Sequence, residues 1–217
     1  MIDYESLWKN GMGLHRTQFN LLSEHFSLNE VGSVVEFGSG GSTYFFRKMQ
    51  SAGMKFRLTS FDHNPKFSFK ESAHKDLAAG GRFTLNVKDL ISCSDEVFER
   101  SFAEKRFLRE SFSRVRGGEV DNFRIKNAFY DIRPDEIGDG IDFVVLDGPS
   151  GNGRSLAWLL LRDKLTFPCY ALIDDANHYD FVARARCLLD IDVLVEVQDV
   201  RVHPLFSYAF IRINKKV

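Results

Sequence analysis

The sequence predicts an α/β fold with a mostly parallel β-sheet and helices on both of its faces. Short apolar runs alternate along the chain with stretches of helical hydrophobic spacing, which is typical of strands joined by crossover helices. The run at 141–146 is almost continuously apolar, as expected of a strand buried between two helix layers. Near the C-terminus two strand-like runs follow one another too closely for a helical crossover, so we expect them to pair antiparallel.

Seven strands are expected in order along the chain. They cover residues 33–37, 56–61, 82–87, 141–146, 169–173, 193–197 and 205–213. A helix is expected after the first strand, with Ser42 and Thr43 as possible N-caps, and another is expected to start at Asn64-Pro65 after the second strand. Apolar spacing from Leu156 and again from Phe181 predicts the helices after the fourth and fifth strands.

Residues 1–217 are expected to form one domain, because single domains commonly reach about 200 residues. Residues 1–30 are predicted to hold one or two N-terminal helices, with Leu22 and Phe26 on the inner face. Residues 92–138 are too long for a simple link and are predicted to be a helical insertion. This insertion carries phenylalanines among many arginines, so an amphipathic helix, a substrate-covering lid and a dimer contact all stay open.

The composition indicates a globular protein and limits its partners. Hydrophobic residues make up 44% of the chain and the formal net charge is −1, which argues against global disorder. The near-neutral balance removes the simplest electrostatic case for nucleic acid or an anionic membrane as partner. No apolar run approaches the roughly 18 residues of a membrane span. We therefore expect neither nucleic acid nor membrane as a partner.

The cysteines and the N-terminal residues suggest a cytoplasmic protein. Cys93, Cys169 and Cys187 are odd in number, far apart and without CxxC spacing, which argues against a disulfide scaffold or a cysteine zinc site. The first residues, MIDYESLWKNGMG, lack the positive start and apolar run of a signal peptide. A reducing compartment is the expectation.

A glycine turn follows the first predicted strand, where glycines allow a tight turn and the close approach of a ligand to the backbone. It reads Gly38-Ser39-Gly40-Gly41, with Glu36 just before it and Asp62 at the end of the next strand, near the spacing of a ribose-binding carboxylate. A dinucleotide-binding fold competes with this interpretation, but its GxGxxG fingerprint wants glycine where Thr43 stands.

The stretch from Glu36 to Thr43 resembles the first motif of the class I S-adenosylmethionine-dependent methyltransferases, in the form ExGxGGST. That resemblance implies a Rossmann-like seven-stranded methyltransferase sheet and a cofactor site made of Glu36, Gly38, Ser39, Gly40, Thr43, Asp62 and Asp89. The turn would line the methionine part of S-adenosyl-L-methionine, Asp62 would bind the ribose hydroxyls and Asp89 would lie near the adenine. Two structural alternatives stay open: Glu36 satisfied by local backbone N–H groups, and Asp62 as a helix N-cap or turn residue.

Acidic residues follow the fourth and fifth predicted strands. Asp147 ends one and the pair Asp174-Asp175 ends the next, so the three carboxylates should meet at one edge of the sheet. Neighbouring carboxylates repel unless a proton or cation neutralises them, and oxygen ligands suit Mg²⁺. The pattern LDG…IDD resembles the metal-dependent O-methyltransferases, which implies these three residues as ligands of a divalent cation. Alternatively, the pair caps the next helix and Asp147 shapes a turn.

Two further residues near these carboxylates have chemistry to offer. His178 could act as a general base or as an extra metal ligand, and a structural role is the alternative. With Asp147 it forms the predicted catalytic pair. Arg154 follows a DGP turn that resembles a group of glycan and small-metabolite methyltransferases, and it either pairs with a carboxylate of the substrate or cofactor or is a plain surface residue.

The best functional expectation is methyl transfer from S-adenosylmethionine to an oxygen of a small molecule or sugar, with Mg²⁺ as a possible assistant. A bound cation would lower the pKa of the acceptor oxygen, and the protein would align that oxygen with the methyl group. An aminopropyl-transfer or other adenosyl-cofactor enzyme on the same scaffold is one alternative. A non-catalytic interaction protein is another, and a homodimer is possible through the phenylalanine-rich insertion.

Overall fold

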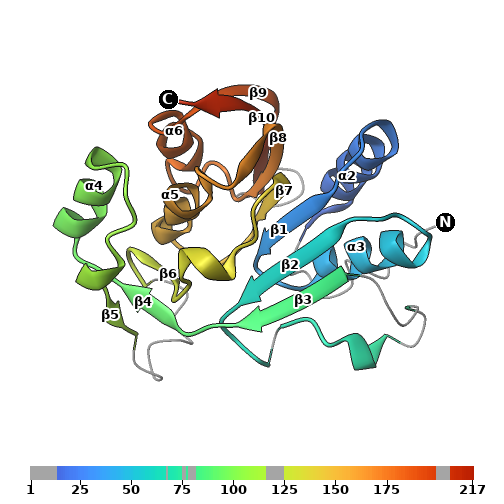
Figure 1. The fold of residues 1–217 in the computed structure, drawn as a ribbon, viewed down its shortest axis with the longest axis horizontal. Helices are drawn as coiled ribbons and strands as arrows, with labels where there is room; N and C mark the ends of the chain where they lie inside the picture. The colour runs from blue at the N-terminus through green and yellow to red at the C-terminus, as the bar shows by residue number, and fades with distance from the viewer. Residues whose placement is uncertain (1–13, 67, 75–76, 78–81, 116–124, 199–205) are drawn as a thin grey trace.

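A seven-stranded β-sheet forms the centre of the computed structural model, which describes residues 14–66, 68–74, 77, 82–115, 125–198 and 206–217 (Figure 1). In sheet order the strands are β3 (Arg82–Val87), β2 (Arg57–Asp62), β1 (Ser33–Phe37), β7 (Ile141–Leu146), β8 (Leu165–Asp174), β10 (Ser207–Lys216) and β9 (Leu189–Gln198). Strand β10 runs antiparallel to both neighbours, whereas the other pairs are parallel. The predicted sheet with a C-terminal antiparallel strand is confirmed.

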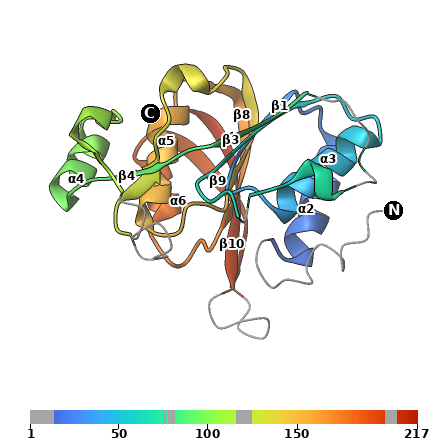
Figure 2. The same ribbon diagram turned by 90° about the horizontal axis from the view of Figure 1, so that it is seen from below.

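Helices cover both faces of this sheet, as Figure 2 shows. The helices α2 (Arg16–Leu28) and α3 (Gly41–Ser51) lie on one face, and α4 (Asp95–Ala103), α5 (Ala157–Leu161) and α6 (Phe181–Arg186) lie on the other. Successive side chains of a strand point to opposite faces, so Val34 packs with the cluster under α2 and α3 while Val35 packs with the cluster under α5. Both faces of the sheet are thereby buried.

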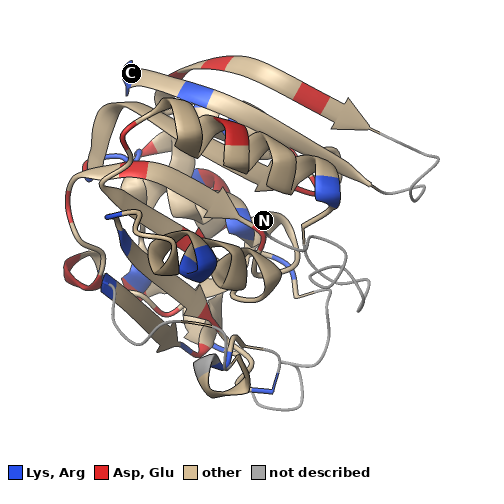
Figure 3. Ribbon diagram, turned by 90° about the vertical axis from the view of Figure 1, so that its right-hand side faces the viewer, with Lys and Arg blue, Asp and Glu red and all other residues tan. Residues whose placement is uncertain are grey.

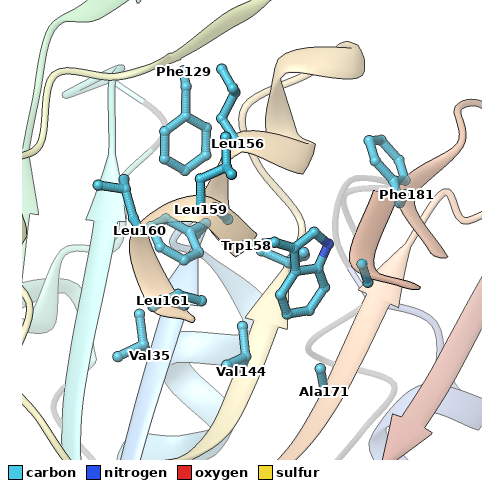
Figure 4. Packing of buried hydrophobic residues seen from close by; sticks show 14 of the residues in the cluster. Val35, Phe129, Val144, Leu156, Trp158, Leu159, Leu160, Leu161, Ala171 and Phe181 are labelled. Carbon is cyan, nitrogen blue, oxygen red and sulfur yellow. The ribbon is translucent and has the colours of Figure 1, made fainter. Parts of the chain in front are cut away.

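The larger apolar cluster fills the space between the sheet and α5 (Figure 4). Trp158 and Phe181 are fully buried there, and Val35, Val144 and Ala171 approach them from three neighbouring strands. Strands buried on both sides must be apolar throughout, which is why β1 and β7 begin and end at the residues that the sequence predicts.

The predicted helical insertion at 92–138 is mixed in structure rather than helical. A small antiparallel sheet in the order β5-β4-β6 joins β4 (Leu90–Ser92), β5 (Ser113–Arg114) and β6 (Ala128–Tyr130). The only α-helix among its described residues is α4, which is amphipathic. Residues 116–124 lie outside the described part of the chain.

The phenylalanines of this segment that the structure describes do not form an exposed surface. Phe98 and Phe102 of α4 are buried in the main core, and Phe112 is partly buried with its ring centroid 5.1 Å from that of Phe107. The amphipathic-helix interpretation is confirmed for α4. The homodimer stays a prediction, but its basis in exposed phenylalanines was wrong for Phe98 and Phe102.

Two predicted helix starts are wrong, and side-chain hydrogen bonds explain both. Between β2 and β3 the described residues contain only a short 3-10 helix, Glu71–Ala73. The Asp62 carboxylate accepts hydrogen bonds from the backbone of His63 and Asn64 and holds a turn at the predicted helix start. Helix α3 has Gly40 as its N-cap instead of Ser42 or Thr43, which are buried inside the helix.

Charged residues protect the outer edge of the sheet. Strand β9 pairs only with β10, and its sequence LDIDVLVEVQ alternates buried or half-buried residues with more exposed ones, acidic side chains among them (Figure 3). Charges on an edge strand oppose pairing with another chain. In the part of the chain that the structure describes, no helix has the length and apolar character needed to cross a membrane.

Candidate active site

The carboxyl ends of β1, β2, β7 and β8 lie at one edge of the sheet and bring most of the predicted site residues together. Strands β1 and β2 are parallel neighbours, and so are β1 and β7 and then β7 and β8. Open α/β sheets bind ligands beyond such strand ends, near the point where the strand order reverses. Here the reversal lies between β1 and β7, because β2 and β3 continue on one side of β1 and β7 and β8 on the other.

The glycine turn after β1 is interlocked with the loop after β7. Gly38 has a φ of +93°, and a Cβ built on it would lie 2.8 Å from the backbone nitrogen of Gly148. The Phe37 carbonyl, in turn, accepts hydrogen bonds from the backbone N–H groups of Asp147 and Gly148, at 2.9 and 2.7 Å. Only glycine fits at Gly38, so this residue fixes the relative position of the two loops.

Ser39 links the glycine turn to the end of β2. The Oδ2 atom of Asp62 accepts hydrogen bonds from the backbone N–H of Ser39 at 3.0 Å and from its hydroxyl at 2.8 Å. The Oδ1 atom accepts from the backbone of His63 and Asn64, as described above. Asp62 is therefore a turn residue and not a helix N-cap, and its carboxylate lies beside the turn where the ribose carboxylate was predicted.

Glu36 lies beneath the turn, fully buried. Its Oε2 atom accepts hydrogen bonds from the hydroxyls of Thr43 and Ser60, each at 2.5 Å, and Thr43 accepts one from the backbone of Gly40 at 2.9 Å. Hydroxyl groups thus replace the backbone N–H partners that the sequence suggested. Burial raises the pKa of Glu36 to about 7, against the opposing effect of these hydroxyls and that of Ser42.

Two of the predicted cofactor residues have very different surroundings. A Cβ built on Gly40 would meet no atom within 4 Å, so the space in front of this residue is open. The Asp89 side chain, on the link after β3, is largely exposed and pairs with Arg114. The backbone next to Asp89 lies close to the site, because the Lys88 N–H donates a hydrogen bond to the Asp62 carbonyl. The Asp89 carboxylate, however, pairs with Arg114.

The predicted acidic cluster forms around an arginine. The Nη1 atom of Arg154 donates a hydrogen bond to the Asp174 carbonyl at 2.8 Å, and its Nη2 atom lies 3.6 Å from Asp175 Oδ2. Asp147 and Asp174 end the neighbouring parallel strands β7 and β8. Arg154 is 2% exposed, so its interpretation as a plain surface residue was wrong.

Two carboxyl groups of this cluster, those of Asp147 and Asp174, are poorly solvated and repel one another. Desolvation raises the pKa of Asp147 and of Asp174, and the neighbouring charges of the cluster raise both further. The positive charge of Arg154 acts in the opposite direction on both. The cluster therefore contains its own partial charge compensation.

The donor set does not fit the predicted divalent cation. Within the described ranges, no group of three or more His, Cys, Asp or Glu side chains has the arrangement of a metal site. Asp174 Oδ1 accepts a hydrogen bond from Gln18 at 2.7 Å, and Asp175 faces Arg154. A divalent cation among these carboxylates would lie close to a fixed guanidinium, which repels it.

His178 lies at the rim of a groove beside this cluster. Its Nδ1 atom is 3.7 Å from Asp175 Oδ1, and its backbone N–H donates to the Asp175 carbonyl at 2.9 Å. The groove has a volume of about 650 Å³ and runs between α4, the loop before β6 and the loop before α6. His178 lines this groove, whereas Asp147 is not among its lining residues.

Two residues that the sequence did not assign to the site belong to its surroundings. The hydroxyl of Tyr130 lies against Gly148, where an added Cβ would be 2.6 Å away. Burial, together with the negative charges of Asp62 and Asp147, raises the pKa of this hydroxyl. Ser60 stands directly opposite Glu36 in the register of β1 and β2. Only this pairing could have identified Ser60, because nothing in its local sequence marks it.

Solved structures with this fold include several O-methyltransferases. The O-methyltransferase TomG from Streptomyces achromogenes, solved in complex with SAM, has a TM-score of 0.55 and 11% identity, over 94% of this chain and 82% of its own. A putative O-methyltransferase from Klebsiella pneumoniae has a TM-score of 0.54 and 11% identity, over 97% and 87%. A putative caffeoyl-CoA O-methyltransferase from Staphylococcus aureus has 0.52 and 10%, over 99% and 93%.

Sequence comparison adds no relative to these structures. No protein-family model matches the chain, and no curated protein matches it either. At about one identical residue in ten, the likeness is one of architecture alone. The chain has the Rossmann-like fold of the class I S-adenosylmethionine-dependent methyltransferases.

Proposed function

We propose that this protein is an S-adenosylmethionine-dependent methyltransferase that acts on an oxygen of a small molecule or sugar. One observation carries the proposal: the turn Gly38-Ser39-Gly40 is hydrogen-bonded to Asp62 at the sheet edge where this fold binds ligands. The neighbouring O-methyltransferase TomG, which was solved with SAM, supports the same cofactor.

The residues of the turn fit the cofactor. The open space in front of Gly40 leaves room for a ligand against the backbone. The Asp62 carboxylate already accepts four hydrogen bonds, so a ribose hydroxyl would replace one of them when the cofactor binds. When bound, the cofactor supplies an electrophilic methyl group on a sulfonium. Ser39 and Asp62 would hold and orient it, and the interlocked loops of Gly38 and Gly148 would fix the distance to Asp147.

The groove at His178 suits a neutral, hydroxylated acceptor. Its two long basic side chains are already paired: Lys126 lies 2.5 Å from Asp95, and Arg184 binds both carboxylate oxygens of Glu99 at 2.8 and 2.5 Å. Cations engaged in this way are poor partners for a phosphate or carboxylate of a ligand. Amide groups such as that of Asn152 suit hydrogen bonds to ligand hydroxyls, and the exposed ring of Tyr179 suits packing against the face of a sugar.

Two groups could take the proton of the acceptor hydroxyl. Asp147 stands beside the cofactor turn, and His178 stands in the groove. Most of the rate enhancement would come from alignment of the acceptor oxygen with the methyl group, because methyl transfer needs little further chemistry from the protein. No step of this proposal passes through Mg²⁺, since the donor set does not fit it.

Calorimetric titration with S-adenosylhomocysteine tests the cofactor site. We expect micromolar binding by the wild type, with and without Mg²⁺, and loss of binding in Asp62→Ala. The control is Asp139→Ala, which removes an exposed carboxylate that pairs with Lys164 in the loop before β7. Equal binding by Asp62→Ala and wild type, or no binding at all, contradicts the proposal. A preference for the decarboxylated cofactor would instead identify an aminopropyl-transfer enzyme.

A further inference from the structure

Two backbone carbonyls and an aromatic ring hold the guanidinium of Arg154 in place, in addition to its ion pair with Asp175. Its Nε atom donates to the Pro149 carbonyl at 3.0 Å, its Nη1 atom donates to the Asp174 carbonyl, and its Cζ atom lies 5.2 Å from the centroid of the Phe181 ring. These contacts tie the loop after β7 to the loop after β8. A guanidinium fixed by backbone carbonyls and a ring is a preorganised positive charge.

The carboxylates are arranged around this charge. Asp175 has a φ of +54°, an uncommon conformation for a residue other than glycine, and its Oδ2 atom faces Arg154 at 3.6 Å. The backbone of Asp174 lies beside the same guanidinium, because its carbonyl accepts the hydrogen bond from Arg154 Nη1. An isolated group of buried carboxylates would need such a counter-charge or a bound cation to stay ionised.

We infer that Arg154 is the built-in cation of this cluster, which it holds in the place where the sequence predicts a divalent metal ion. Arg154 is accordingly a positioning residue: it pairs with Asp175 and holds the loop after β7 against the end of β8. The inference concerns the site of the proposed methyl transfer, but it rests on the contacts of Arg154 alone and can be tested without turnover.

Mn²⁺ binding, followed by electron paramagnetic resonance at about pH 8 where carboxylates compete well with protons, tests this assignment. We expect weak binding by the wild type and by Arg154→Lys, which retains the charge. In Arg154→Gln the carboxylates lose their counter-charge, and we expect Mn²⁺ affinity to rise by about ten-fold or more. Adding Asp175→Asn to Arg154→Gln should abolish that gain. Equal Mn²⁺ affinity of the wild type and Arg154→Gln would overturn the inference.

The wild type and Asp175→Asn keep the test decisive if Arg154→Gln does not fold. Binding of Mn²⁺ by the wild type in the micromolar range, lost in Asp175→Asn, would show a metal site and overturn the inference. Binding in the millimolar range or weaker, unchanged by Asp175→Asn, supports it. The S-adenosylhomocysteine titration is read separately, so a failed cofactor proposal and a failed assignment of Arg154 give different results.

Discussion

The contact between Gly38 and Gly148 makes a quantitative prediction about stability. A Cβ on Gly38 would lie 2.8 Å from the Gly148 nitrogen and 3.0 Å from the Asp147 carbonyl carbon, and both are backbone atoms that cannot rotate away. Gly38→Ala therefore combines two costs: a left-handed backbone conformation and an overlap that forces the loops after β1 and β7 apart.

A second glycine separates these two costs. Gly53 has a φ of +100°, close to the +93° of Gly38, but a Cβ built on it would meet nothing within 4 Å. The positive φ alone costs about 1–2 kcal/mol, offset by about 0.4–1 kcal/mol from the less flexible unfolded chain, so Gly53→Ala should lower the free energy of unfolding by about 1 kcal/mol. The overlap adds about 1–3 kcal/mol, which gives about 2–4 kcal/mol for Gly38→Ala.

Urea unfolding of the wild type and both variants, followed by circular dichroism, measures the difference. For a chain of this length each kcal/mol corresponds to about 2–4 °C, so thermal melts should separate the two variants clearly. If Gly38→Ala lies within about 0.5 kcal/mol of Gly53→Ala, the two loops are not interlocked, and the fixed spacing between the cofactor turn and Asp147 is refuted.

Two further predictions concern buried positions. The pKa of Glu36 is raised from 4.5 to about 7 in the folded protein, so folding favours the protonated side chain. The contribution of Glu36 to the free energy of unfolding is therefore fully present below about pH 4.5 and is lost as the pH rises through 7. Relative to Glu36→Gln, the wild type should lose up to about 3 kcal/mol of unfolding free energy from pH 4.5 to 8 in urea titrations, and parallel curves would contradict this. Gly153→Ala would place a Cβ 2.0 Å from the Ala128 carbonyl oxygen, so we expect the free energy of unfolding to fall by more than about 3 kcal/mol. Thermal melts measure this as a lowered melting temperature, and a melting temperature equal to that of the wild type would disprove the close packing.

The strands could be predicted from the sequence because burial on both faces leaves few alternatives. In β1 and β7 nearly every residue is buried, so the apolar run and the strand coincide. The long strand β8 was predicted too short, since its first residues, which include Thr166 and Pro168, do not continue the apolar pattern. The α/β class and the glycine turn followed from patterns that are local in sequence, whereas the arrangement of the strands in the sheet came from the resemblance to the methyltransferases.

The loops could not be predicted in the same way, because distant side chains decide their hydrogen bonds. Thr43 looked like an N-cap, but its hydroxyl donates to Glu36 on the preceding strand. Asn64-Pro65 looked like a helix start, but the N–H groups of His63 and Asn64 donate to the Asp62 carboxylate and the chain forms a turn there. In both cases hydrogen bonds to a buried carboxylate outside the segment determine the local structure, and the local helix propensity does not.

Arg154 shows the same effect at the level of chemistry. Three acidic residues at neighbouring strand ends favour a metal ion as long as only their own sequence neighbourhoods are considered. Arg154 lies 20 residues before Asp174, and only the pairing of β7 with β8 brings the two loops close enough for the guanidinium to reach the cluster. The fold therefore decides whether such a cluster binds a cation from solution or contains a basic side chain in its place. An acidic motif predicts a metal site only where no basic side chain of the adjoining loop reaches the same carboxylates.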